Sequence, residues 1–330
     1  MAYSRRQFGR LAATSLPVAA AVLSNPRLLF AESKPNSRFN GVLVGVITPY
    51  SYHNLPNDAE SLLKFMVKDG ISATEIQSPP VEEYAGAPKA PPFGGGRPPG
   101  PAGTPRPKPT PEQIAAQKAR NEAMTQWRLA APMAKFVELR KRYNDAGISI
   151  YGFKLQLTMD MPDAEYDYAF NVAKALGADQ LTMELPEDSS LTKKVGEFAI
   201  KHKLMVGYHA HLQALPTTWD EAMAQSAYNG INLDVGHYTA AGNRDALDFI
   251  KKNHARITSM HLKDRKFKEN GGANMPWGEG DTPIKEALQL MKKEHYKFPA
   301  TIELEYAPPE GSDSEKEIVK CLAYAKAALA

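Results

Sequence analysis

Apolar strand-like segments alternate with amphipathic helical segments from residue 41 to the end of the chain. This rhythm constrains the fold more than any other feature, because it is typical of a parallel sheet covered by helices. The expected strands are residues 41–48, 71–77, 148–157, 180–185, 204–209, 231–234, 257–262 and 301–305. Roughly eight strand–helix units over about 290 residues predict an α/β protein with a single (β/α)8 TIM-barrel domain.

Helical periodicity predicts helices at residues 58–69, about 112–144, 163–176 and 314–329. Gly177 follows the third of these and is expected to end it. No Gly-x-Gly-x-x-Gly motif follows the first strand, which argues against a dinucleotide-binding, doubly wound sheet.

The N-terminal segment is predicted to be an export signal. Arg5 and Arg6 are followed by Phe8, a short apolar stretch and a small residue near Ala31. The paired arginines resemble a twin-arginine signal, so residues 1–31 are set apart from the fold and a periplasmic or secreted location is expected. The apolar stretch is too short and interrupted to span a bilayer, so no stable membrane anchoring is expected. An amphipathic N-terminal helix is the alternative.

Residues 86–111 interrupt the rhythm with a segment rich in proline and glycine. Such a composition cannot bury enough apolar surface to fold alone, so we expect an extended insertion in the second strand–helix loop of the domain at 32–330. A tolerated surface insertion is one interpretation. In a barrel this loop lies on the active-site face, so a lid or an arm of a homo-oligomer is the other.

Composition excludes some kinds of partner and site. The net charge is +3, with much of the positive excess in the first forty residues and in the insertion, so no nucleic-acid partner is expected. Cys321 is the only cysteine, so neither an intramolecular disulfide nor a cysteine-based metal site can form. A metal ion would therefore need oxygen and imidazole ligands.

Residue types that bind metals stand at or near the carboxyl ends of most expected strands. They are Glu75, Glu184, His209, His211, Asp234, His237, His261, Glu303 and Glu305. A barrel brings these strand ends to one mouth, so we expect the side chains to meet there. Carboxylates buried together need a cation between them. Such a set suits Mn²⁺, Mg²⁺, Co²⁺ or Zn²⁺, and the sequence does not choose among them.

Other polar residues near strand ends are expected to have plainer roles. We place Glu75 and His53 at the rim of the site. Asp264 and Glu187 are expected at helix starts and on the solvated surface.

Four short motifs resemble those of inosose dehydratases and related proteins. They are residues 208–211 (Tyr-His-Ala-His), 233–237 (Leu-Asp-Val-Gly-His), 261–264 (His-Leu-Lys-Asp) and 302–305 (Ile-Glu-Leu-Glu). Each is weak alone, but their order over residues 40–328 is similar to that of the xylose-isomerase-like TIM-barrel superfamily of sugar isomerases, epimerases and keto-sugar lyases.

The resemblance implies a divalent metal held by Glu184, Asp234, His261 and Glu303. In the family the first glutamate sometimes comes from the fifth strand, where this sequence has His209. Whether His209 is a further ligand or a substrate contact stays open. His237 matches a position that binds substrate hydroxyls in epimerases and metal in the endonuclease branch. The expected substrate-binding residues are His209, His211, His237, Lys154, Lys263 and Glu75.

The expected activity is that of a metal-dependent sugar isomerase, epimerase or keto-sugar lyase working through a metal-stabilised ene-diolate. Glu184 and Glu303 would be the base and acid pair. Export favours a non-phosphorylated sugar, a glycoside or a 3-keto derivative as substrate. A metallo-endonuclease with the same barrel, or a non-catalytic sugar-binding barrel, are the alternatives.

Overall fold

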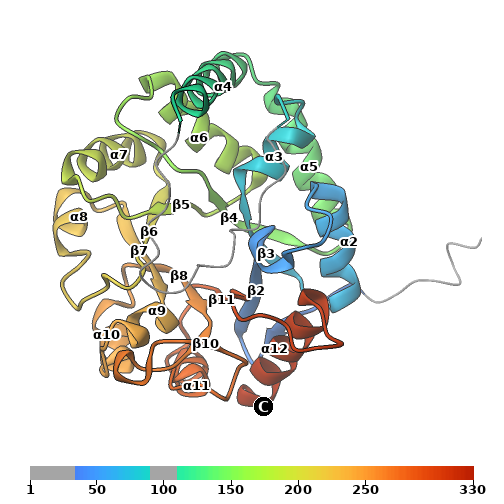
Figure 1. The fold of residues 1–330 in the computed structure, drawn as a ribbon, viewed down its shortest axis with the longest axis vertical. Helices are drawn as coiled ribbons and strands as arrows, with labels where there is room; N and C mark the ends of the chain where they lie inside the picture. The colour runs from blue at the N-terminus through green and yellow to red at the C-terminus, as the bar shows by residue number, and fades with distance from the viewer. Residues whose placement is uncertain (1–33, 90–109) are drawn as a thin grey trace, which may run out of the picture. The chain divides into compact units, whose positions relative to one another are not determined.

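Eight parallel strands close into a barrel with helices around it in the computed structural model, which describes residues 34–89 and 110–330 (Figure 1). The strands neighbour one another in chain order, and the last closes against the first, with Thr301 opposite Gly45. They are β2 (Val42–Thr48), β3 (Ala73–Gln77), β4 (Ser149–Lys154), β5 (Gln180–Glu184), β6 (Met205–His209), β7 (Asn229–Asp234), β8 (Ile257–Leu262) and β11 (Ala300–Ile302). The predicted (β/α)8 fold is confirmed.

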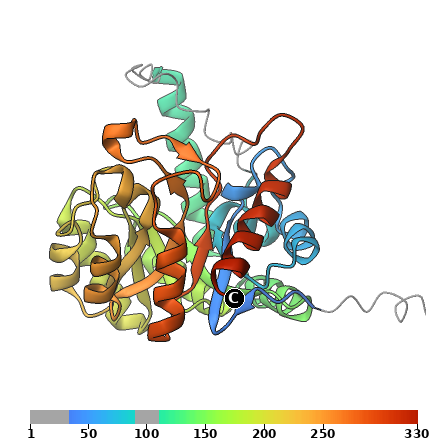
Figure 2. The same cartoon turned by 90° about the horizontal axis from the view of Figure 1, so that it is seen from below.

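Helices follow the strands on the outside of the barrel (Figures 1 and 2). They are α2 (Ala59–Asp69), α3 (Ser78–Tyr84), α4 (Pro111–Leu129), α5 (Met133–Asp145), α6 (Asp163–Leu176), α7 (Ser189–His202), α8 (Asp220–Gln225), α9 (Val235–Ala240), α10 (Ala246–Asn253), α11 (Ile284–Glu294) and α12 (Ser314–Ala328). Among the described residues, none of the helices has the length and apolar character needed to cross a membrane.

Short elements complete the described chain. They are β1 (Arg38–Phe39), β9 (Asp264–Arg265), β10 (Asn274–Met275) and the 3-10 helices η2 (Tyr50–Tyr52) and η3 (Lys268–Asn270). Strands β9 and β10 form an antiparallel hairpin separate from the barrel sheet. The predicted export signal and most of the predicted insertion lie outside the described residues, so both stay predictions.

Local sequence signals explain where helices begin and end. The carboxylate of Asp58 accepts hydrogen bonds from the backbone N–H groups of Glu60 and Ser61 and so caps α2. Helix α6 has the predicted bounds, and Gly177 ends it with a φ of 75°, a left-handed conformation that glycine adopts without strain.

The prediction of one helix over residues 112–144 is wrong. The structure has two helices, α4 and α5, separated by Ala130, Ala131 and Pro132. A proline disfavours helical geometry in the residue before it, and Pro132 occupies the position directly before α5 in an extended conformation. The periodicity on either side continues well enough to hide this break from a sequence pattern.

The interior of the barrel is filled by alternating large and small residues. Tyr151 of β4 crosses the interior and its hydroxyl lies 2.7 Å from the Thr301 hydroxyl. Gly45 makes room for it, because a Cβ at that position would lie 2.6 Å from the Tyr151 ring. The barrel is therefore a packed core, and only its ends are free for a functional site.

Candidate functional site

The carboxyl ends of neighbouring strands bring polar residues to one level. Glu184 at the end of β5 is opposite His209 at the end of β6. Asp234 at the end of β7 is opposite His261 in β8, and Glu303 directly follows β11. Because adjacent parallel strands stay in register, these five side chains share one end of the barrel, as predicted.

Four of these residues form a buried set that could hold a metal ion. Ligand atoms of His209, Asp234, His261 and Glu303 all lie within 4.8 Å of one another, and each residue is buried. Asp234 Oδ2 is 3.3 Å from His209 Nε2, and Glu303 Oε2 is 2.9 Å from His261 Nδ1. Two imidazoles and two carboxylates are a donor set that suits a divalent transition metal.

Each imidazole of this set has a carboxylate at its other nitrogen. His209 Nδ1 lies 3.0 Å from Glu184 Oε2, and His261 Nε2 lies 2.9 Å from Glu75 Oε2. Metal-binding histidines usually donate their second N–H to a carboxylate, which fixes the ring and its tautomer. This pattern occurs twice here, so the side chains fit a divalent ion held through His209 Nε2 and His261 Nδ1.

Glu184 itself lies outside the four-residue set. Its side chain is 41% exposed and contacts Lys154 Nζ at 2.7 Å and His211 Nε2 at 3.2 Å. Burial would raise the pKa of Glu184, but hydrogen bonds from His209 and His211 hold it well below its usual value. Glu184 is therefore an ionised carboxylate on the open side of the site.

Glu75 is buried, although the sequence analysis placed it at the rim. It is 0% exposed, and its carboxylate also accepts a hydrogen bond from the Thr182 hydroxyl at 2.7 Å. Burial would raise the pKa of Glu75, but the charge of His261 lowers it. A strand alternates its side chains between two faces, and Glu75 points into the barrel rather than toward its mouth.

Lys263 lies among the carboxylates of the site. Its ammonium group is 3.0 Å from Asp234 Oδ2, 3.0 Å from Glu303 Oε2 and 2.9 Å from Glu305 Oε2. Burial would lower the pKa of Lys263, but Asp234 and the two glutamates raise it. Tyr50 in turn donates to Glu305 Oε1 at 2.7 Å. Lys263 can therefore neutralise carboxylates or donate to an oxygen of a ligand.

His237 has cationic neighbours at both ring nitrogens. Lys263 Nζ is 2.9 Å from Nε2, and Arg265 Nη1 is 2.7 Å from Nδ1. Burial lowers the pKa of His237 to about 3. His237 also forms a second set of nitrogen atoms with His209 and His211. That set is a poorer cation site than the first, because it contains no carboxylate to offset the positive charges of Lys263 and Arg265 beside His237.

The surface position predicted for Asp264 is wrong, and Tyr50 and Arg265 are site residues that no predicted motif includes. Asp264 was expected on the surface, but it is buried and accepts N–H groups from the loop after β10. The partners of this buried carboxylate are backbone N–H groups, so no oppositely charged residue in the sequence indicates that it is buried. A cue for Arg265 was its position two residues after Lys263, because alternate residues of an extended segment point to the same side.

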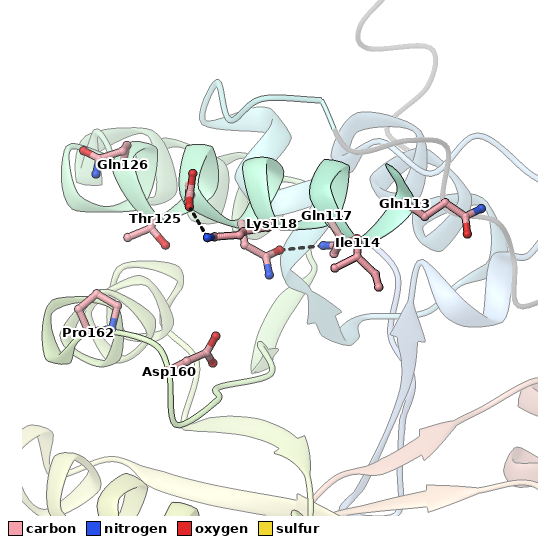
Figure 3. Close-up of a pocket in the computed structure, with 10 residues that line it drawn as sticks. Gln113, Ile114, Gln117, Lys118, Thr125, Gln126, Asp160 and Pro162 are labelled. Carbon is pink, nitrogen blue, oxygen red and sulfur yellow. Dashed lines mark hydrogen bonds and ion pairs between the residues drawn. The ribbon is translucent and has the colours of Figure 1, made fainter. Parts of the chain in front are cut away.

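A groove of about 800 Å³ lies away from these residues (Figure 3). Helix α4 and the segment after β4 line it, including Ile114, Gln117, Thr125, Asp160 and Pro162. None of the predicted site residues lines the groove. Its lining offers no cluster of metal ligands or bases, so the chemistry belongs to the strand ends.

Comparisons with solved structures support the fold. A xylose isomerase domain protein from Planctomyces limnophilus is 15% identical with a TM-score of 0.57, over 87% of this chain and 97% of its own. An L-ribulose 3-epimerase is 11% identical with a TM-score of 0.56, over 87% and 94%. The 3-keto-D-glucoside 4-epimerase from E. coli is 9% identical with a TM-score of 0.54, over 87% and 99%.

The sequence itself identifies the family. No curated protein matches the chain. The family model described as xylose isomerase-like TIM barrel matches residues 122–324, which carry most of the barrel and nearly all of the site. The chain therefore belongs to the xylose isomerase-like TIM barrel family.

Proposed function

We propose that the protein is a divalent-metal-dependent enzyme that isomerises, epimerises or eliminates at the carbon beside the carbonyl of a sugar. One observation carries the proposal: two imidazoles and two carboxylates form a buried set, and each imidazole is backed by a further carboxylate. Family membership supports it, and two of the similar structures are those of sugar epimerases.

His209, Asp234, His261 and Glu303 would hold the ion. When bound there, a divalent ion polarises a carbonyl and makes the neighbouring C–H more acidic. We assign proton removal to Glu184, because it is an ionised carboxylate on the open side of the site. Glu303, on the opposite side of the His209 ring, would return a proton that it takes up from the Lys263 ammonium group 3.0 Å away, while Glu184 releases its proton to solvent. Return of the proton to the other face of the same carbon gives epimerisation, and return to the neighbouring carbon gives isomerisation.

Charge balance supports an uncharged substrate. The site has three cationic side chains, Lys154, Lys263 and Arg265. It has five carboxylates, those of Glu75, Glu184, Asp234, Glu303 and Glu305. A divalent ion would cancel the remaining two negative charges, and both lysines already pair with carboxylates. A phosphate would make the site net negative, and among the described cations of the site only Arg265, already bonded to His237 and Gly272, lacks a carboxylate partner. We therefore propose a free sugar, a glycoside or a 3-keto derivative, met outside the cytosol.

Metal content and proton exchange test this proposal together. The purified protein should contain about one equivalent of Mn, Co, Zn or Mg after loading, measured by elemental analysis. In deuterated water it should incorporate deuterium beside the carbonyl of a candidate keto sugar. Glu303→Gln should abolish both metal retention and exchange, because Glu303 lies in both the ligand set and the proton path.

Glu310→Gln is the matched control, since Glu310 is exposed on the loop that follows the same strand. It should retain both properties. The proposal is wrong if wild-type protein loaded with metal exchanges no keto sugar, or if Glu303→Gln still does. Cleavage of abasic DNA by the loaded protein would instead favour the endonuclease alternative.

A further inference from the structure

His237 lies between two cationic side chains, and each could donate a hydrogen bond to one of its ring nitrogens. Arg265 Nη1 approaches its Nδ1 to 2.7 Å, and Lys263 Nζ approaches its Nε2 to 2.9 Å. The ring is 7% exposed, so water cannot easily satisfy either nitrogen. A neutral imidazole has one donor nitrogen and one acceptor nitrogen. Only one of the two cations can therefore donate to it.

Of the two cationic side chains, Arg265 is the better placed to donate to the acceptor nitrogen of His237. A guanidinium always carries its protons, and Arg265 is fixed by bonds from Nε and Nη2 to the carbonyl of Gly272, at 3.0 and 2.6 Å. Lys263 has three N–H groups and three carboxylates within 3.0 Å to receive them. His237 Nδ1 thus accepts from Arg265, and the ring proton belongs on Nε2.

The position of Arg265 is supported by the buried Asp264, which precedes it in the chain. Arg265 pairs with Asn274 across the β9–β10 hairpin. The neighbouring Asp264 carboxylate accepts N–H groups from Gly278 and Gly280 at 2.8 and 2.9 Å. A Cβ on Gly280 would lie 2.0 Å from Asp264 Oδ1, so this position requires glycine. The hairpin and its following loop therefore form a rigid support for the guanidinium.

With this tautomer, the Nε2–H of His237 has no acceptor among residues 34–89 and 110–330. It faces Lys263 Nζ, itself a donor, and Asp234 Oδ2 is 4.0 Å away. A buried donor without an acceptor is costly, unless a ligand atom completes it. We propose that Arg265 is a positioning residue that fixes His237 as the Nε2–H tautomer, which then donates to a hydroxyl or carbonyl oxygen of the substrate. The sugar nature of that oxygen rests on the proposed function, whereas the tautomer does not.

NMR of the whole protein, with ¹⁵N-labelled histidine and no substrate, tests the tautomer directly. His237→Gln identifies the His237 signals by their loss. Wild-type His237 should show a protonated Nε2 and an unprotonated Nδ1. Arg265→Met should move the proton to Nδ1, because Lys263 then becomes the one donor facing the ring. Arg265→Lys, which keeps a cationic donor, should restore the wild-type pattern.

Arg244→Met is the matched control, since Arg244 is exposed and pairs with Glu269 beside the same hairpin. It should leave the His237 signals unchanged. A wild-type proton on Nδ1, or an unchanged tautomer in Arg265→Met, overturns the inference. If Arg265→Met does not fold, the wild-type spectrum alone decides.

Kinetics separate this inference from the proposed function. With metal content unchanged, Arg265→Met should lower kcat/KM for keto-sugar exchange about ten- to a hundredfold, and Arg265→Lys should recover part of it. The predicted tautomer in a protein that exchanges no sugar would overturn the proposed function alone. Full activity in Arg265→Met would overturn the positioning role alone.

Discussion

The site has an inner side and an outer side that differ in solvent exposure. The inner side consists of five residues that are all 5% exposed or less: Glu75, His209, Asp234, His261 and Glu303. The outer side consists of Glu184 and His211, whose side chains are 41% and 55% exposed. Inner groups find their partners in one another, so they can hold an ion without competition from water. Outer groups reach solvent, so a base such as Glu184 can release to water the proton that it takes from a substrate.

Losing one carboxylate from each side should separate ion binding from turnover. Asp234→Asn removes an inner charge that contacts Lys263 and His209, so metal retention should be lost and exchange should fall roughly a thousandfold or more. Glu184→Gln removes an outer charge, so metal should stay while exchange falls about a hundredfold. Elemental analysis and deuterium incorporation, measured on the same samples, check both.

The family resemblance implies the opposite for Glu184, as a metal ligand. Loss of metal from Glu184→Gln, equal to the loss from Asp234→Asn, would break the distinction between the two sides. It would also mean that His209 supports Glu184 rather than the reverse. Unfolding curves for both variants exclude a general loss of structure as the cause.

The inner side should also give the metal-free protein a distinctive pH dependence. Burial would lower the pKa of His261, but Glu75 and Glu303 outweigh it and raise the pKa to about 10 from 6.5. The protonated ring therefore stabilises the metal-free fold fully below about pH 6.5, and this contribution is lost as pH rises toward 10. Urea unfolding should show the loss, and His261→Gln should flatten it.

Added metal should reverse this trend. A metal needs the neutral imidazole, so its affinity rises with pH and offsets the stability lost from the protonated ring. A metal-free protein whose stability is the same at about pH 6.5 and pH 9, in wild type and in His261→Gln alike, would show that the inner charges do not interact as their distances imply.

The sequence predicts the barrel fold well, and it also predicts the end of the barrel at which the site lies. It predicts poorly where the individual side chains point. Strand rhythm depends on local apolar pattern, and strand ends in a barrel must converge, so Asp234, His261 and Glu303 meet as expected. Glu184 and His209 are opposite each other in register. No local pattern tells which of the two faces the ion, because that depends on how neighbouring strands tilt and pack.

The residues that support the proposed ligands through hydrogen bonds are the ones that are hardest to predict from the sequence. Glu75 looks like a rim residue until the structure shows His261 beside it, 186 positions later in the chain. Arg265 contacts His237 only because Asp264 anchors the hairpin that carries it. Such contacts join distant segments, so a single sequence can at most suggest that a residue such as Arg265 faces the site, and it does not reveal the contact itself.

The smallest expected effect compares two histidines whose rings lie 4.9 Å apart. His211→Asn removes an exposed partner of Glu184 and should change the free energy of unfolding by less than about 1 kcal/mol. His209→Asn removes a buried ring and its hydrogen bonds to Glu184 and Asp234, and should cost about 1–3 kcal/mol in the metal-free protein. Equal costs in urea unfolding would mean that the outer side is as tightly built as the inner one, and proton exchange there would then need another explanation.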